Sequence, residues 1–332
     1  MKAVMSRFVG GPDTLTFEDI GEPELTPGSV LVSIRAIGVN YLDLLIIEDR
    51  YQFWPQRPFS PGAEISGVIE AVGEGVSLHK PGDRVLAFIG WGGMVEKAVI
   101  EADLCFKIPD SMPFEDAAAF LLAYGTSYYA LADRASLQPG ETLLVLGASG
   151  GTGSAAVELG KAMGSRVLAA ASSNEKLEAA LEAGAENGLI YPVGPLDAAA
   201  QKDLSGRFKV LCGHDGANVI YDPVGGDYAD PALRAIAWQG RYLVVGFSAG
   251  IPKMPLNLPL LKACDIRGVF WGAATARDPE RHRQAVAELF EFYRQGAIKP
   301  RIDGLYPLQD AVLALQSLAG RQVRGKAVLT LS

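Results

Sequence analysis

The chain has 332 residues, more than one hydrophobic core normally organises, so two domains are expected. Hydrophobic residues make up 49% and charged residues 20%, a composition typical of a folded, water-soluble protein. The formal net charge of −8 argues against a general surface for nucleic acids or anionic membranes.

The cysteines and the N-terminal segment favour a reducing compartment. Cys105, Cys212 and Cys264 are odd in number and far apart, so a disulfide framework is not expected. No histidine accompanies them at a spacing that would make Cys212 or Cys264 a nucleophile, and we interpret both as structural. The segment MKAVMSRFVGG has no long apolar run, and no stretch approaches the roughly 20 apolar residues of a membrane helix. We therefore expect a cytoplasmic protein.

The first hundred residues are rich in predicted strands. Residues 29–39 alternate apolar and polar side chains, while 64–73 and 83–90 are short and β-branched, with Gly and Pro between them. This pattern predicts a compact, barrel-like domain.

The pattern changes near Phe114 to helices that alternate with strands. A helix is predicted over 115–135, followed by strands at 141–147, 165–172, 218–226, 241–247 and 265–272, with helices at 151–164 and 174–185. This alternation predicts a parallel, doubly wound sheet. Helices at 281–296 and 308–320 and a strand at 326–331 complete the chain.

The segment LLVLGASGGTG (143–153) predicts a strand that runs through a glycine-rich turn into a helix. The first glycine of a G-x-G-x-x-G fingerprint falls on Ala148, which requires only that its backbone avoids positive φ. Gly150 would allow the backbone to approach a phosphate at the helix N-terminus, and Gly153 would allow close packing of helix on strand. The alternative is an ordinary turn that uses glycine for its geometry; the surrounding strands and helices favour a nucleotide site.

The end of the next predicted strand indicates the type of nucleotide. NAD sites place an acid there for the ribose hydroxyl, but this chain has Ala171. Ser172, Ser173 and Lys176 follow, and they suit a 2′-phosphate. We expect Glu175 to face elsewhere, and we predict NADPH rather than NADH. The alternative is that Lys176 is a surface lysine and the site accepts either.

Several short segments, in this order and spacing, carry a family resemblance: GVNYLD (38–43), PGAEISGVIEAVGEGV (61–76), KPGDRV (80–85), Gly125-Thr126, GASGGTG (147–153), YDPVGGD (221–227), LVVGFSAG (243–250) and RGKAVL (324–329). On these segments the chain resembles, over nearly its whole length, the zinc-free quinone oxidoreductases of the medium-chain dehydrogenase/reductase superfamily, the group that includes zeta-crystallin.

The resemblance implies an α/β fold with a GroES-like β-barrel-type catalytic domain (1–122 and 275–332) and a Rossmann domain (123–274) with a doubly wound parallel sheet. It implies hydride transfer from NADPH in the cleft between them, and a homodimer that pairs the edge strand within 265–271. It also implies a set of cofactor contacts: Thr126, the turn Ala148, Ser149, Gly150, Gly151, Thr152 and Gly153, then Ser172, Ser173, Lys176, Tyr191, Val224, Gly225, Phe247, Ser248, Phe270, Trp271, Gly272 and Arg321.

Zinc is not expected. The zinc-dependent relatives need a cysteine and a histidine where this chain has Asn40 and Ala63, and they carry a four-cysteine lobe that is missing here. The few cysteines and histidines show no ligand spacing. Without a Lewis acid, plain alcohol oxidation is disfavoured, whereas quinones and enones accept hydride through their own conjugation.

Three residues are candidates for the acceptor site. Asn40 would donate an amide hydrogen to a developing oxyanion, and Tyr51 is a second donor candidate whose alternative role is packing. Asp43 is expected to orient the Asn40 loop rather than to transfer protons. A tyrosine common in the family is absent from the apolar run 44–47, which indicates a more apolar pocket.

The leading hypothesis is a metal-free, NADPH-dependent reductase of quinones or activated enones. One alternative is a reductase of enoyl thioesters, which would need a basic mouth for the CoA phosphates. The other is an NADPH-binding protein without important turnover, because relatives serve as lens crystallins or bind RNA. The negative charge disfavours RNA.

Overall fold

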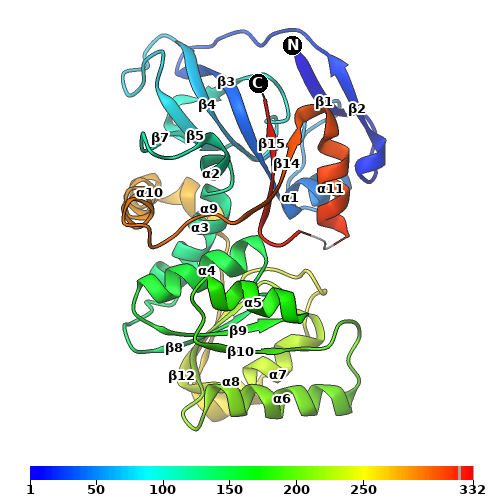
Figure 1. Ribbon diagram of the computed structural model, residues 1–332, viewed down its shortest axis with the longest axis vertical. Coiled ribbons are helices and arrows are strands. Elements are labelled where there is room, and N and C mark those ends of the chain that lie inside the picture. The colour runs from blue at the N-terminus through cyan, green and yellow to red at the C-terminus, as the bar shows by residue number, and fades with distance from the viewer. Residues whose placement is uncertain (321–322, 332) are drawn as a thin grey trace. The chain divides into compact units, whose positions relative to one another are not determined.

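The computed structural model describes residues 1–320 and 323–331, which form two compact units (Figure 1). The first unit is Met1–Leu122 together with the chain from Lys299 on, and the second is Ala123–Ile298. The first boundary lies at the predicted position, whereas the second lies after Ile298 rather than after residue 274. The second boundary lies later in the chain because helix α10 (Pro279–Arg294) makes its contacts within the second unit. Arg281 of α10 forms an ion pair of 2.7 Å with Asp133.

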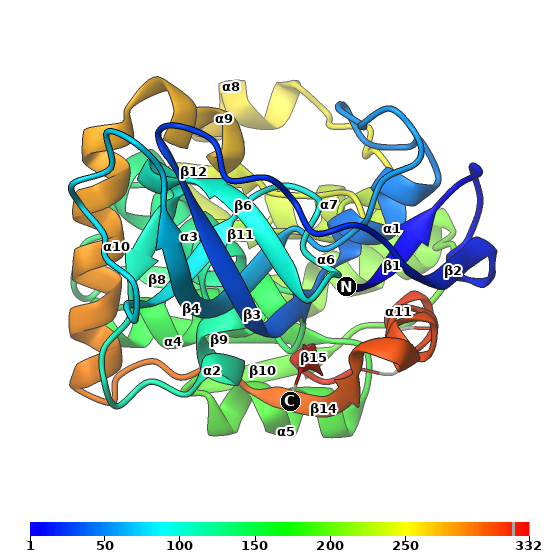
Figure 2. The same ribbon diagram turned by 90° about the horizontal axis from the view of Figure 1, so that it is seen from above.

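The first unit is built on a mostly antiparallel sheet with the order β14-β15-β3-β4-β5-β7, in which β6 also pairs with β3. Figure 2 shows β3 and β4 side by side in this sheet, as their antiparallel register requires. The strands are β3 (Ser29–Val39), β4 (Glu64–Val72), β5 (Arg84–Phe88), β6 (Lys97–Glu101), β7 (Cys105–Lys107), β14 (Ile302–Pro307) and β15 (Lys326–Thr330). A separate hairpin joins β1 (Lys2–Ser6) and β2 (Leu15–Asp19), and the helices are α1 (Tyr41–Ile47), α2 (Phe114–Ala118) and α11 (Ala311–Ala319).

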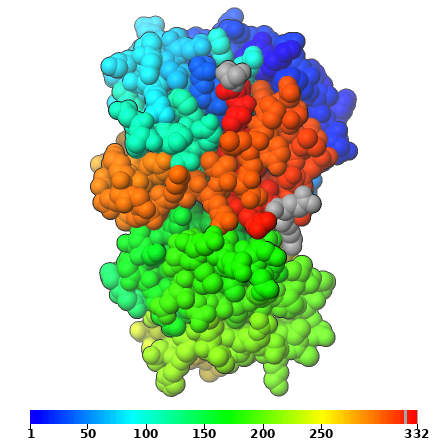
Figure 3. All heavy atoms as spheres, in the orientation of Figure 1, coloured from blue at the N-terminus to red at the C-terminus, as the bar shows by residue number. Residues whose placement is uncertain are grey.

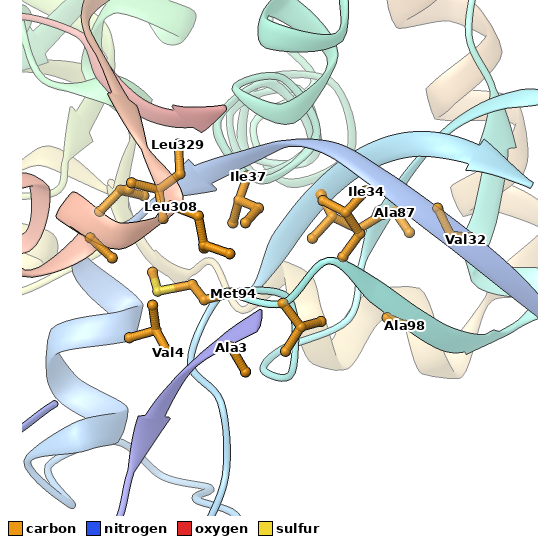
Figure 4. Close-up of a cluster of buried hydrophobic side chains, with 14 of the residues drawn as sticks. Ala3, Val4, Val32, Ile34, Ile37, Ala87, Met94, Ala98, Leu308 and Leu329 are labelled. Carbon is orange, nitrogen blue, oxygen red and sulfur yellow. The ribbon is translucent and has the colours of Figure 1, made fainter. Parts of the chain in front are cut away.

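Both ends of the chain contribute to the core of the first unit. Ile34 and Ile37 of β3 pack in one cluster with Val4 from the N-terminal hairpin and with Leu308 and Leu329 from the C-terminal segment (Figure 4). The C-terminal segment pairs with the rest of the sheet through β15, which runs antiparallel to β3. Lys326, the first residue of β15, is thereby placed beside the end of β3.

The second unit has a parallel sheet with the order β10-β9-β8-β11-β12-β13. This is the Rossmann order, and the chain reverses direction across the sheet between β8 and β11, where such folds bind nucleotides. The strands are β8 (Thr142–Leu146), β9 (Arg166–Ala171), β10 (Asn187–Ile190), β11 (Ala217–Asp222), β12 (Ile236–Val244) and β13 (Asp265–Gly268). The predicted α/β fold, with a doubly wound parallel sheet in the second unit, is confirmed.

Helices cover both faces of the parallel sheet. They are α3 (Leu121–Tyr128), α4 (Gly151–Ala162), α5 (Asn174–Glu182), α6 (Ala198–Cys212), α7 (Ala229–Leu233), α8 (Asn257–Lys262), α9 (Trp271–Arg277) and α10. Side chains of α4, α5 and α6 lie on the face of this unit that is seen in Figure 3. None of the helices within 1–320 and 323–331 has the length and apolar character needed to cross a membrane.

Two predicted elements differ from the structure. The single helix expected over 115–135 is divided into α2, α3 and a π-helical turn, Tyr129–Arg134. The break falls before Leu122 because the amide of Leu122 donates to the carboxylate of Glu64 at 2.8 Å rather than to a carbonyl one turn earlier. The strand expected over 265–272 ends at Gly268, and α9 begins at Trp271.

Candidate functional site

The glycine-rich turn joins β8 to α4 with the geometry that the sequence predicted. Gly147 takes the positive φ of +58°, and Ala148 is not among the residues with positive φ. Ala148 is buried, and its amide donates to the carbonyl of Ala170 on the neighbouring strand at 3.1 Å. An alanine is therefore compatible with the place where the fingerprint has its first glycine.

Gly153 and Gly150 serve different purposes in this turn. A Cβ on Gly153 would lie 2.1 Å from the carbonyl oxygen of Gly147, so only glycine fits between the helix and the turn. Gly150 is exposed, with φ −75° and ψ 168°, and a Cβ there would meet nothing nearer than 3.5 Å. Gly150 is the N-cap of α4 and has no side chain to cap the helix, so its side chain takes up none of the first-turn amides, the groups that bind a phosphate at a helix N-terminus.

Ser173 and Lys176 meet at the start of α5, directly after β9. Ser173 is the N-cap, and its hydroxyl accepts the amide of Lys176 at 3.3 Å. Its own hydrogen remains available for donation. Ala171, where NAD sites have an acid, is buried at the end of β9, while Ser172 and Lys176 are half-buried and Glu175 is exposed. This corner offers donors and a cation without a carboxylate at the strand end.

Tyr191 lies beside the same strand end. Its amide donates to the carbonyl of Ala171 at 2.9 Å. Its ring is buried and tilted against the ring of Tyr228, with 4.8 Å between the centroids. The expected contact residues Ser173, Lys176 and Tyr191 are thus anchored around one strand end, whereas Arg321 lies outside the described residues.

Asp222, which the sequence reasoning missed, organises the loop that carries Val224. It ends β11, and its Oδ1 accepts the amides of Val224 and Gly225 at 2.8 and 2.9 Å. Its other oxygen accepts the hydroxyl of Tyr242, and burial raises the pKa of both side chains. The signal in the sequence was an acid that closes an apolar strand before Pro and two glycines. Phe247 and Ser248, expected beside the nucleotide, are exposed.

Gly225 lets two loops of this region approach each other. It has φ +67°, and a Cβ there would lie 2.6 Å from the carbonyl oxygen of Gly250. The loop after β11 therefore packs directly on the loop after β12.

Thr126 lies on α3 next to a buried hydrogen-bond chain. The hydroxyl of Ser127 donates to the carbonyl of Thr152, in the first turn of α4, at 2.9 Å. Since that hydrogen is used, the hydroxyl of Tyr221 must be the donor in its 2.9 Å contact with Ser127. The chain joins α3, β11 and the start of α4.

The structure changes the expected role of the Trp271 side chain. Its ring is 5% exposed and lies over Gly125, where a Cβ would be 2.6 Å from ring atom Cζ2. It also makes an edge-on contact with His282, at 5.5 Å between centroids, and burial lowers the pKa of His282 to about 4. The indole is therefore a packing element of its unit, while Phe270 is exposed and Gly272 half-buried.

A buried polar network occupies the end of β3 in the first unit. Asp43, on the first turn of α1, accepts the amide of Asn40 at 2.8 Å and the amides of Gly62 and Ala63 at 3.2 and 3.1 Å. Burial raises the pKa of Asp43 to about 6 against these favourable hydrogen bonds. This geometry accords with the expectation that Asp43 orients the Asn40 loop.

Lys326 and Glu64 complete the network, and the sequence reasoning did not select either. The ammonium of Lys326 lies 3.1 Å from Oε2 of Glu64, and the two side chains are 7% and 0% exposed. The same ammonium donates to Oδ1 of Asn40. Two features of the sequence point to these network residues: the acid in GAE (62–64) and the lysine that begins an apolar strand in RGKAVL.

The amide of Asn40 is fully engaged within the protein. Its Nδ2 donates to the carbonyl of Gly38 at 3.0 Å and to Oε2 of Glu64 at 3.2 Å. Both partners are acceptors and Lys326 is a donor, so the orientation of the amide is fixed by its surroundings. The expectation that this amide donates to a substrate oxyanion is corrected: in this conformation it has no free hydrogen.

Tyr51 is half-buried and packs on the core cluster of the first unit. Burial raises the pKa of its phenol, which keeps the hydroxyl protonated and able to donate. Packing and donation are compatible in this position.

Within residues 1–320 and 323–331, no three His, Cys, Asp or Glu side chains come together as a metal site. Ala63 offers no ligand, and the Lys326 ammonium already occupies the neighbourhood of Asn40 and Glu64. The absence of zinc stays a prediction.

Known proteins resemble this chain over its full length. Residues 26–110 match the family of the alcohol dehydrogenase GroES-like domain, and residues 151–291 match the zinc-binding dehydrogenase family. A quinone oxidoreductase-like protein 2 homolog from Nematostella vectensis is 38% identical over 99% of this chain and 88% of its own.

Two solved structures are similar in fold and sequence. The quinone oxidoreductase of Escherichia coli, complexed with NADPH, has a TM-score of 0.90 and 28% identity and covers all of both chains. A mycobacterial protein complexed with NADPH has a TM-score of 0.90 and 30% identity, again over all of both chains. With the Rossmann and GroES-like units and the glycine-rich turn described above, these similarities show that the chain belongs to the quinone oxidoreductase group of the medium-chain dehydrogenase/reductase superfamily.

Proposed function

We propose that this protein is an NADPH-dependent reductase that transfers hydride to a quinone or an activated enone without a metal ion. The observation that carries the proposal is the corner formed by Ala171, Ser173 and Lys176, where a cation and hydroxyl groups replace the acid of NAD sites. Ser172 and Tyr191 complete the proposed site for the 2′-phosphate. Two similar structures contain NADPH, which supports the same cofactor here.

The cofactor of this chain is NADPH, and the residues fit it. Gly150, Gly151 and Thr152 would hold the pyrophosphate at the start of α4, with Ala148, Ser149 and Gly153 shaping the turn. When bound, NADPH supplies a hydride to the conjugated acceptor, and a proton from water completes the two-electron reduction. Thr126 and the loops around Val224, Phe247 and Phe270 would bind the ribose and nicotinamide.

The acceptor would lie against the start of α1. Asn40 and Asp43 hold that segment in place, and exposed Tyr41 lies between them in the chain. Tyr41 and Tyr51 carry the hydroxyl groups of the segment 40–51, and burial raises the pKa of Tyr51, which keeps its hydroxyl protonated. We propose that Tyr51, rather than the Asn40 amide, donates to the developing oxyanion.

The test is turnover of the purified protein with NADPH and a panel of quinones, enones and enoyl thioesters. Quinones or enones should accelerate NADPH oxidation above the rate without acceptor. Turnover of enoyl thioesters alone would replace the proposed acceptor class. Tight NADPH binding with no turnover of any acceptor would favour the non-enzymatic alternative.

We also propose a homodimer that pairs β13 edge to edge. This strand is at the end of the sheet order, and the exposed leucines Leu256, Leu260 and Leu261 lie in and before α8, directly ahead of it. Sedimentation of wild type and of a Leu260→Asp/Leu261→Asp variant tests this. The variant should sediment as a monomer.

We propose a cytoplasmic location because the cysteines are free and buried. Cys105, Cys212 and Cys264 are free and buried, and burial raises the pKa of the Cys105 and Cys212 thiols to about 12. Such thiols are inert and form no disulfide with one another, as suits a reducing compartment.

A further inference from the structure

The ion pair of Lys326 and Glu64 is unusual because it is buried. The side chains are 7% and 0% exposed, so both charges have lost most of their hydration. Well-packed apolar side chains of the same volume often stabilise a fold as well as a buried ion pair does. The pair is therefore weak evidence for a purely stabilising role.

Glu64 uses both carboxylate oxygens to join separate segments. Oε1 accepts the amide of Leu122 at the start of α3. Oε2 accepts from Lys326 on β15 and from the amide of Asn40 after β3. A Cβ on Gly38 would lie 2.9 Å from Oε2 and 2.0 Å from the carbonyl of Ala118, so β3 reaches this carboxylate only because residue 38 is glycine.

Lys326 determines which way the Asn40 amide points. Its ammonium can only donate, so the partner atom on Asn40 must be the carbonyl oxygen Oδ1. The Nδ2 hydrogens are then directed to Gly38 and Glu64. Asn40 in turn precedes α1, and its main-chain amide is held by Asp43.

We propose that Lys326 is a positioning residue of the reductase site: its buried ammonium, balanced by Glu64, locks the Asn40 amide and with it the start of α1. This inference rests on the proposed function, in which the acceptor binds against that segment. Lys326 does not touch the acceptor; it acts through Asn40. A shift of about 1 Å in a reacting partner lowers turnover by about a hundredfold. Loss of the contact between Lys326 and Asn40 should therefore lower turnover even in a variant that stays folded.

The experiment compares Lys326→Met with the double variant Lys326→Met/Glu64→Gln. The single variant leaves the Glu64 charge buried and unpaired, and its thermal unfolding midpoint falls. The double variant removes both charges at nearly constant volume, and its midpoint returns towards wild type. Its kcat/KM for the acceptor stays about ten- to a hundredfold below wild type, while its Kd for NADPH changes less than about twofold, because the glycine-rich turn belongs to the other unit.

Lys107→Met is the matched control, since Lys107 forms a 2.9 Å ion pair with Asp83 in the same unit, with its side chain 52% exposed. It should keep wild-type kinetics, and Lys326→Arg should recover part of the lost turnover. A folded double variant with wild-type kcat/KM overturns the positioning role.

Amide hydrogen exchange separates this inference from the proposed function. If wild type reduces no acceptor, the proposed function fails. Whether Lys326 fixes the Asn40 segment is then decided by hydrogen exchange alone. Amides of Asn40, Asp43 and Ala63 should exchange at least about tenfold faster in the double variant than in Lys107→Met. Equal exchange rates in the two variants would show that Lys326 does not fix the Asn40 segment.

Discussion

Lys326 Nζ lies 3.1 Å from Glu64 Oε2, although 262 residues separate the two positions in the chain. This contact belongs to the first unit, whereas the glycine-rich turn and the Ser173–Lys176 corner belong to the second. Substitutions in one unit should therefore affect the acceptor, and substitutions in the other should affect the cofactor.

Lys176→Ala should raise the KM for NADPH about tenfold or more and leave the KM for NADH nearly unchanged. The lysine would interact with the 2′-phosphate, which NADH lacks. Steady-state kinetics with both nucleotides measure the difference, and Lys161→Ala on α4 is a control lysine of the same unit. Equal effects on the two nucleotides would remove the 2′-phosphate assignment.

Gly150→Ala should weaken NADPH binding, whereas Gly153→Ala should lower the stability of the fold. Alanine is sterically permitted at Gly150, so the fold should survive while NADPH binds more weakly. At Gly153 the Cβ would lie 2.1 Å from the carbonyl oxygen of Gly147, and overpacking of this kind lowers the free energy of unfolding by about 1–3 kcal/mol or more. Thermal unfolding and NADPH titration of both variants check this. A Gly153→Ala protein as stable as Gly150→Ala contradicts the packing described here.

Asp43 should make the protein less stable as the pH rises from about 4 to about 6. Burial raises its folded pKa to about 6, above the value of about 3.9 in an unfolded chain, so the folded state binds more protons in this range. The contribution of Asp43 to the free energy of unfolding falls by about 2–3 kcal/mol across the range and is constant above it. Asp43→Asn should lack this fall.

The Asp43 contribution is measured as a difference between proteins. His282, whose pKa burial lowers to about 4, changes stability in the opposite direction over much of the same range. It is present in both proteins and cancels when denaturant unfolding of wild type and Asp43→Asn is compared at each pH. Parallel curves would show that Asp43 has an ordinary pKa in the folded protein.

Gly125 and Trp271 should show strong energetic coupling. Gly125→Ala places a Cβ 2.6 Å from the Trp271 ring and should be destabilising, while Trp271→Ala should lower the free energy of unfolding by about 3–5 kcal/mol through the cavity it leaves. In the double variant the alanine at 125 meets no ring, so its cost should disappear. A double-mutant cycle by denaturant unfolding measures this; additive effects would show that the two residues do not touch.

The sequence predicts most clearly what is determined locally. The glycine-rich turn and the alternation of strands and helices depend on residues within a few positions of one another. The parallel, doubly wound sheet was predicted from that alternation, and the Rossmann domain from the family resemblance.

Contacts across long stretches of chain were not predictable in the same way. A lysine at the start of an apolar strand is ordinarily at the surface, and nothing near Lys326 indicates partners 286 and 262 residues away. The packing of the Trp271 ring on Gly125 and His282 was likewise not predicted, because 146 and 11 residues separate these partners from it in the chain. The helix over 115–135 is broken by Glu64, a partner outside the segment.

Metal analysis and turnover measured on one sample show most directly whether the reductase works without a metal ion. The protein is dialysed against a chelator, its metal content is measured, and NADPH oxidation is followed with a quinone or enone that wild type accepts. We expect unchanged kcat and KM with far less than one metal ion per chain. Loss of turnover on chelation, restored by adding zinc, would contradict this expectation.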